Sequence, residues 1–165
     1  MKKICVLFAL VFVFLAVSCS PSRSDPLAAL KNEGRAEIVI EKNGCRAGGI
    51  ITLGAVPDEG ERDLTLTLTS PETVKGTVIK RLYGKTTATR EGLSFDTGAF
   101  DAVFALFSPA GVGEASVTSR DGIKLTKVAS NANGRSVNIY LSGEGIPVLI
   151  EAEELCVRIV WFEAE

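Results

Sequence analysis

Few side chains in this sequence are suited to catalysis. The 165 residues include no histidine, which removes the commonest general base and a frequent metal ligand. Ser-His-Asp, Cys-His and histidine-based zinc sites are therefore excluded. Two carboxylate clusters remain, Asp58-Glu59 with Glu61 and Glu151 with Glu153-Glu154. They could act as acid and base or bind calcium, but they fall in predicted turns or at strand edges. We expect no enzyme activity, no metal and no cofactor.

Charge and glycine patterns argue against nucleotides and nucleic acids as ligands. Without Lys2 and Lys3, 16 basic side chains stand against 20 acidic ones, and no basic block is present. The stretches 111–113 and 143–145 carry paired glycines but lack the strand-turn-helix setting of phosphate loops. We interpret them as turns.

Two cysteines, Cys45 and Cys156, lie in the predicted folded domain and could form a disulfide in an oxidising compartment. Strand alternation puts Cys156 in phase with Arg158, on the expected solvent face. It puts Cys45 in phase with Ile51, on the expected apolar face. We therefore favour two free thiols, and a disulfide that depends on a bulge remains the alternative.

The first twenty residues have the order of a secretory signal peptide. Lys2 and Lys3 precede an unbroken apolar run, 4–17, and then Ser18 and Cys19. The 14 apolar residues would extend about 21 Å as a helix, short of the roughly 30 Å hydrocarbon core of a bilayer. Cleavage after this segment is therefore favoured over a permanent transmembrane helix.

The segment Leu15-Ala16-Val17-Ser18-Cys19 resembles the lipobox of bacterial lipoproteins, although Ala16 stands where leucine is usual. The resemblance implies a diacylglyceryl group on Cys19, cleavage before it, and palmitate-type acyl chains that anchor the protein at the extracytoplasmic face of a cell membrane. The domains would be a signal peptide (1–18), a lipidated tether (19–25) and a single β domain (26–165). The alternative is a soluble exported protein.

The pattern after the tether predicts many short strands and two helices. The expected helices are 25–32, where Asp25 and Pro26 form an N-terminal signal, and 99–107, where apolar residues recur at helical spacing. Asn43-Gly44, Asp121-Gly122 and Asn133-Gly134 predict tight turns. The expected strands, in which apolar and polar residues alternate, are 36–41, 45–56, 64–69, 77–83, 85–90, 92–95, 115–118, 123–129, 136–141, 147–152 and 155–162.

Consecutive antiparallel strands with a single apolar face must curl around something or stack face to face. We therefore expect a mainly β (α+β) fold, in which a curved antiparallel sheet forms an incomplete barrel with two short helices on its concave side. A closed barrel or a two-sheet sandwich is the alternative.

The order of these features resembles the unclosed-barrel lipoprotein carriers typified by the LolA and LolB localisation factors. The likeness would cover residues 25–165 and includes the strand that ends in Thr69-Ser70-Pro71-Glu72 and the aromatic helix in mid-chain. It implies that the concave face and its helix enclose acyl chains. The side chains that would then line an apolar cavity are Phe100, Val103, Phe104, Phe107 and Trp161.

Two functions remain open from the sequence. The first is a non-catalytic, membrane-anchored lipoprotein of the cell envelope with a cavity for a lipid or an acylated partner. The second is a structural or protein-interaction module, in which the same aromatic side chains fill a solid core and no small ligand binds. Burial in a core would stabilise the fold by about 1.5–3 kcal/mol for each such side chain.

Overall fold

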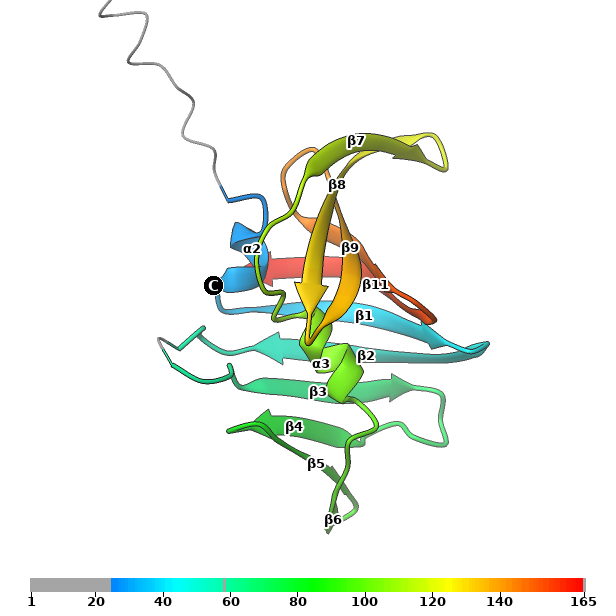
Figure 1. The fold of residues 1–165 in the computed structure, drawn as a ribbon. Helices are drawn as coiled ribbons and strands as arrows, with labels where there is room; N and C mark the ends of the chain where they lie inside the picture. The colour runs from blue at the N-terminus through cyan, green and yellow to red at the C-terminus, as the bar shows by residue number, and fades with distance from the viewer. Residues whose placement is uncertain (1–24, 58, 165) are drawn as a thin grey trace, which may run out of the picture.

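The computed structural model describes residues 25–57 and 59–164, and Figure 1 shows its ribbon. The predicted signal peptide and Cys19 lie outside the described residues. In the described ranges the helices are α2 (Ala28–Lys31) and α3 (Asp101–Leu106). The strands are β1 (Gly34–Lys42), β2 (Cys45–Leu53), β3 (Leu64–Ser70), β4 (Val78–Leu82), β5 (Lys85–Arg90), β6 (Leu93–Asp96), β7 (Ala115–Arg120), β8 (Ile123–Ala132), β9 (Arg135–Leu141), β10 (Pro147–Ala152) and β11 (Leu155–Ala164). Neither helix has the length and apolarity needed to cross a bilayer.

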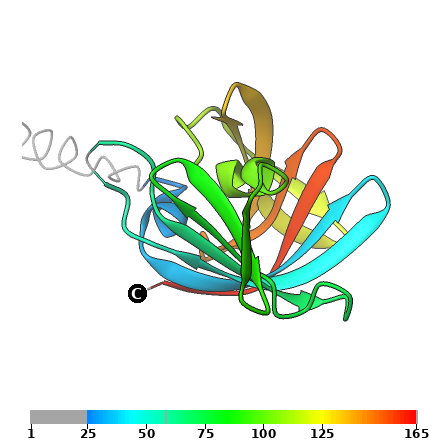
Figure 2. The ribbon, with the colours of Figure 1, turned by 90° about the horizontal axis from the view of Figure 1, so that it is seen from below.

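All of these strands belong to one antiparallel sheet, ordered β6-β5-β4-β3-β2-β1-β11-β10-β9-β8-β7. Two meanders, β1 to β6 and β7 to β11, are joined where β1 pairs with β11. The strands β6 and β7 form the two edges, so the sheet is not closed. Figure 2 shows it curving around α3. The predicted mainly β incomplete barrel with two short helices is confirmed.

Strict alternation produces the concave face of the sheet. Leu64, Leu66 and Leu68 in β3 are at most 3% exposed, whereas the threonines between them point away from the core. Leu66 lies opposite Ile51 on one side and Ile79 on the other. A continuous row of apolar side chains therefore crosses several strands. Because this row is apolar, the concave face must be covered from water.

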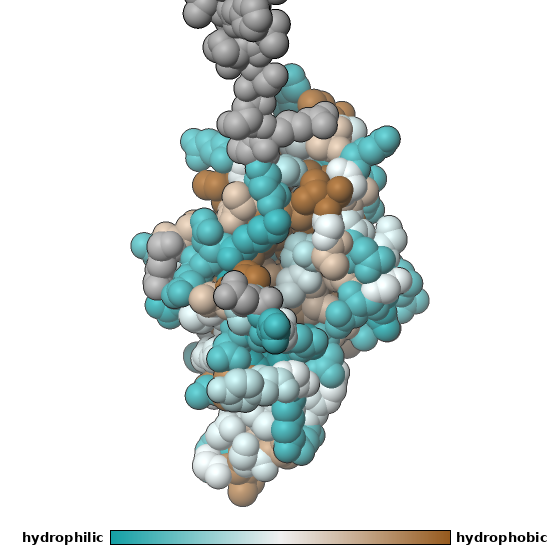
Figure 3. All heavy atoms as spheres, turned by 60° about the vertical axis from the view of Figure 1, so that its left-hand side comes forward, coloured by the Kyte–Doolittle hydropathy of each residue, from teal (hydrophilic) through white to brown (hydrophobic). Residues whose placement is uncertain are grey.

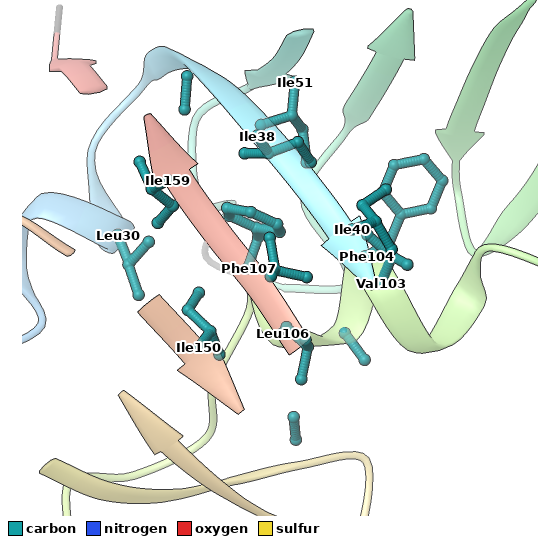
Figure 4. Close-up of a cluster of buried hydrophobic side chains, with 14 of the residues drawn as sticks. Leu30, Ile38, Ile40, Ile51, Val103, Phe104, Leu106, Phe107, Ile150 and Ile159 are labelled. Carbon is teal, nitrogen blue, oxygen red and sulfur yellow. The ribbon is translucent and has the colours of Figure 1, made fainter. Parts of the chain in front are cut away.

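The helix α3 covers that face because the chain has to pass from the edge strand β6 to the opposite edge strand β7. Phe100 and Phe107 flank the helix as its caps, so α3 is shorter than the predicted 99–107. Pro109 follows closely and disfavours helical backbone at the residue before it. Figure 4 shows the helix placing Phe104 and Phe107 among the side chains of the core.

The helix α2 begins at Ala28, later than the sequence predicts, and is shorter than 25–32. The Asp25 carboxylate accepts a hydrogen bond from the Leu27 backbone N–H at 2.9 Å and forms an ion pair with Lys31. The Lys31 ammonium and the Leu27 amide hold the pKa of Asp25 below its ordinary value. This arrangement directs Leu27 and Leu30, each 1% exposed, into the core.

The predicted tight turns are confirmed, and the two cysteines of the described domain lie apart. Asn43 (φ 50°) and Gly44 (φ 77°) both adopt left-handed backbone, as a two-residue hairpin turn requires. Cys45 pairs with Lys42 and Cys156 with Glu41, so the two cysteines sit on opposite faces of the sheet. Both thiols are free.

Candidate functional site

A pocket of about 430 Å³ lies where the end of α2, the loop between β2 and β3, and the segment after α3 meet. We call it the helix-loop pocket. Figure 3 shows the face that carries it, where brown apolar atoms are visible between teal ones. Its lining residues are Leu30, Lys31, Val56, Gly60, Glu61, Arg62, Leu64, Arg81, Ala105, Phe107, Ser108, Pro109, Ala110 and Asn133.

The floor of the pocket is apolar and tightly packed, and its rim is open. Leu30, Leu64 and Phe107 form the floor and are at most 2% exposed. Val56, 55% exposed, and the half-buried Pro109 lie at the rim. Apolar walls with a few convergent polar groups are typical of sites for small amphiphilic ligands.

Of the residues predicted to line a cavity, those of the aromatic helix pack in the hydrophobic core, and one of them also borders the helix-loop pocket. Phe104 is 0% exposed and Val103 4%, and both pack within the main core cluster, with Phe100 partly buried against it. Phe107 belongs to this core and also lies under the helix-loop pocket. The aromatic helix therefore supplies one floor residue, and its other large side chains serve as packing.

The structure does not bring Trp161 to these residues. Its indole lies on the outer face of the sheet, 38% exposed, and donates a hydrogen bond to Glu37 Oε2 at 2.8 Å. Simple alternation along β11 would put Trp161 in phase with the buried Ile159. The pairing of β1 with β11 shifts between Glu37 and Ile38, and this irregularity in the register turns Trp161 outward.

Arg62 joins the elements around the pocket. It is 4% exposed, and its guanidinium donates hydrogen bonds to four backbone carbonyl oxygens. They are those of Leu30, Asn32, Gly54 and Phe107. Burial lowers the pKa of Arg62, and Glu33 opposes this effect, but an arginine stays charged in a protein. A positive charge held by neutral carbonyls therefore sits in the pocket wall.

Arg81 is the second buried arginine of the pocket. It points to the concave side from β4, between Leu64 of β3 and Thr86 of β5. Its Nη2 lies 2.5 Å from Glu61 Oε2. Its Nε is buried and, within the described part of the chain, has no hydrogen-bond acceptor. Arg81 is thus incompletely paired.

The two carboxylate clusters contain ion pairs rather than converging ligands. Glu61 pairs with Arg81, and Glu151 pairs with Arg120 at 2.6 Å. Asp58 lies outside the described residues. Glu153 sits in the turn between β10 and β11. Among the residues that the structure places, no group of three or more His, Cys, Asp or Glu side chains could hold a metal ion.

A smaller polar cluster lies on the outer face of β7 to β11. The Arg120 guanidinium lies 5.3 Å from the Tyr140 ring centroid, a cation–π geometry. Burial raises the pKa of Tyr140 and also that of the Cys156 thiol, and the Glu151 carboxylate adds to both effects. This cluster packs with Leu125.

Sequence reasoning missed both arginines of the helix-loop pocket. The sequence did contain a sign that Arg81 would be buried, because Arg81 alternates in phase with Ile79, and both lie on the buried face of β4. No sequence pattern pointed to Arg62, since it precedes β3 in a polar loop and its four acceptors come from three separate segments, two of them at least 30 residues away.

Comparisons with known proteins report on the fold. No family model matches the chain, and no curated protein is similar to it. The solved structure of MucB has 15% sequence identity and a TM-score of 0.50, covering 88% of this chain and 60% of the MucB chain. An uncharacterised conserved protein from Thermus thermophilus has 9% identity and a TM-score of 0.50, covering 84% and 82%. A LolA superfamily protein from Nitrosomonas europaea has 8% identity and a TM-score of 0.45, covering 85% and 92%.

The MucB and Thermus structures show a shared fold and nothing finer at these identities. The chain spans 60% of the length of the MucB chain.

Proposed function

We propose that this chain is a non-catalytic lipoprotein of the cell envelope, anchored through Cys19 at the extracytoplasmic face of a membrane, which binds an acyl chain in the helix-loop pocket. The acyl chain would belong to a lipid or to an acylated partner protein. The single observation that carries the binding proposal is a pocket of about 430 Å³ with an apolar floor at one end of the concave face.

The size and chemistry of the pocket support an acyl ligand. Its volume falls within the range of about 300–1,000 Å³ that is usual for small-molecule sites. Val56 and Pro109 offer apolar surface at the opening, above a floor formed by the buried Leu30, Leu64 and Phe107. The carriers that the sequence resembles enclose acyl chains on the corresponding concave face.

The absence of histidine from the sequence supports a binding function rather than catalysis. Glu61 and Glu151, one carboxylate from each cluster, form ion pairs with Arg81 and Arg120. We therefore expect no hydrolytic activity that depends on Glu151, so Glu151→Gln should abolish none.

The anchor is tested by metabolic labelling with radioactive palmitate in a bacterial host. The parent chain should incorporate label and fractionate with membranes, and Cys19→Ala should do neither. Cys45→Ala is the matched control, because Cys45 is an exposed thiol in the folded domain, and it should behave as the parent does. An unlabelled parent that fractionates like Cys19→Ala would contradict the anchor.

The ligand is tested by native mass spectrometry of residues 20–165 isolated from the periplasm. Bound lipid should be recovered and should be lost from Ala110→Trp, which places a large ring in the pocket. Ala115→Trp, on the exposed edge strand β7, serves as the control and should retain lipid. Recovery of lipid-free protein in every case would contradict the proposal.

A protein-interaction module is the second candidate, favoured by the edge strand β6. Leu93 is 74% exposed and Phe95 56%, and β6 pairs on one side only. An open edge with apolar side chains can add a strand from a partner. Lipid-free protein whose partner binding is lost in Phe95→Lys would favour this function.

A further inference from the structure

The helix-loop pocket carries more positive than negative charge in its wall. Two buried arginines line it, Arg62 and Arg81, and the carboxylate in its lining is Glu61. Lys31 is also part of the lining, but its ammonium is engaged by Asp25. Buried charge is ordinarily paired, because desolvation of an ion is expensive. The excess of buried positive charge in the pocket wall is therefore unusual, and an anionic ligand would balance it.

Arg62 forms no ion pair with another described residue, although the charge of Glu33 acts on it. Its hydrogen bonds go to backbone carbonyl oxygens, including those of Leu30 and Phe107, and within the residues that the structure places none goes to a carboxylate. The carbonyl oxygens orient and solvate the guanidinium, but they leave its net charge in place. The charge consequently acts on anything that enters the pocket.

Arg81 has unused bonding capacity in the same place. A guanidinium has five N–H donors, and the Nε of Arg81 is buried without an acceptor among the described residues. The side chain is 10% exposed, whereas its partner Glu61 is 48% exposed. Glu61 belongs to the loop between β2 and β3, so its carboxylate can turn into solvent while Arg81 stays fixed on β4.

We propose that the helix-loop pocket selects amphiphiles with an anionic oxygen head group, a carboxylate or a phosphate monoester, which Arg81 binds in place of Glu61. This inference rests on the proposed acyl-binding function and adds the head group to it. The chain of the ligand lies against Val56 and Pro109, above the buried Leu30 and Phe107, and its head faces Arg81. Arg62 adds long-range attraction. Charge-assisted, forked hydrogen bonds from a guanidinium suit both head groups.

Glu61 acts as an internal competitor in this arrangement. It occupies Arg81 Nη2 when the pocket is empty, and each binding event has to replace that ion pair. Removing the Glu61 charge should therefore strengthen binding of an anionic ligand and leave binding of an uncharged one unchanged.

The test uses the full chain in isolated membranes and three photoreactive probes of equal chain length: palmitate, hexadecyl phosphate and hexadecanol. Crosslinks are mapped by mass spectrometry to peptides that contain Val56 or Pro109, and half-saturating concentrations are compared. We expect at least one anionic probe to saturate at about a tenfold lower concentration than hexadecanol, as one charge-assisted hydrogen bond would give. The better anionic probe identifies the head group.

Two variants and their controls decide the role of Arg81. Arg81→Gln should remove the advantage of the anionic probes and leave hexadecanol unchanged, and Glu61→Gln should increase that advantage. The controls are Arg46→Gln and Glu41→Gln, an exposed ion pair on β2 and β1. Equal saturation of charged and uncharged probes by the parent would overturn the head-group proposal alone. No saturable labelling by any probe would overturn the acyl-binding function as well.

If Arg81→Gln does not fold, Glu61→Gln decides the question, because it leaves both buried arginines in place. An increase in affinity for the anionic probes supports the proposal. An affinity equal to that of Glu41→Gln overturns it.

Discussion

Trp161 Nε1 donates a hydrogen bond to Glu37 Oε2 at 2.8 Å, and on the outer face of the sheet this contact joins β1 and β11, the first and last strands in sequence. The residues are 124 positions apart in sequence. The contact covers part of the seam where the two meanders meet, and it places the single tryptophan of the protein away from the helix-loop pocket.

Trp161 fluorescence should therefore report on the outer face rather than on ligand binding. We expect acrylamide to quench it efficiently, because the residue is 38% exposed. Saturation with an acyl ligand should leave the emission maximum unchanged. Glu37→Leu should change the emission, since it removes the acceptor of the indole N–H. A blue shift that depends on ligand would contradict the outward placement.

Phe104→Ala should destabilise the fold by about 3–5 kcal/mol, the usual effect of deleting a fully buried aromatic ring. The ring is 0% exposed and lies in the main core cluster. Chemical denaturation of residues 20–165 measures the change in unfolding free energy. Phe95→Ala, at a 56% exposed position, should stay within about 0.5 kcal/mol of the parent. A loss below about 1 kcal/mol for Phe104→Ala would indicate that the ring borders open space.

Arg62→Met should destabilise the protein by about 3 kcal/mol, because several buried carbonyl oxygens lose a charged donor while the apolar stem is kept. Arg62→Lys should recover only part of this loss, since an ammonium lacks the planar fork of a guanidinium. Hydrogen exchange should quicken around α2, which Arg62 holds through Leu30 and Asn32. Arg46→Met is the exposed control, with an expected change within about 0.5 kcal/mol. Equal stability of the two methionine variants would refute the role given to Arg62.

Cys156 should react with a maleimide at higher pH than an ordinary thiol. Burial raises its pKa first, and the carboxylates of Glu151 and Glu41 raise it further. The thiolate is the reactive form, so a raised pKa moves the rate-against-pH curve to higher pH. Glu151→Gln should move the curve back toward lower pH.

Peptide-resolved mass spectrometry separates the labelling of Cys156 from that of the exposed Cys45. We expect Cys45 to be labelled first at neutral pH. A Cys156 curve that Glu151→Gln leaves in place would show that the carboxylate does not act on this thiol.

Local patterns in the sequence predicted most of the secondary structure. The run Leu64 to Thr69 can bury one face only as a strand, and Asn43-Gly44 can adopt left-handed backbone with little strain. These properties depend on residues a few positions apart. For this reason the strands, the turns and the curved, one-sided sheet could be predicted before their neighbours were known.

Only the tertiary structure decided which side chains meet at the candidate site. The irregular register between β1 and β11 reversed the phase of Trp161, and no local pattern marks that position. The acceptors of Arg62 lie 8 to 45 residues away along the chain. The alternation of residue types predicts which face of its own strand a side chain occupies. What that face contacts depends on how distant parts of the chain come together. In this protein the pairing of β1 with β11 and the crossing of α3 decide it.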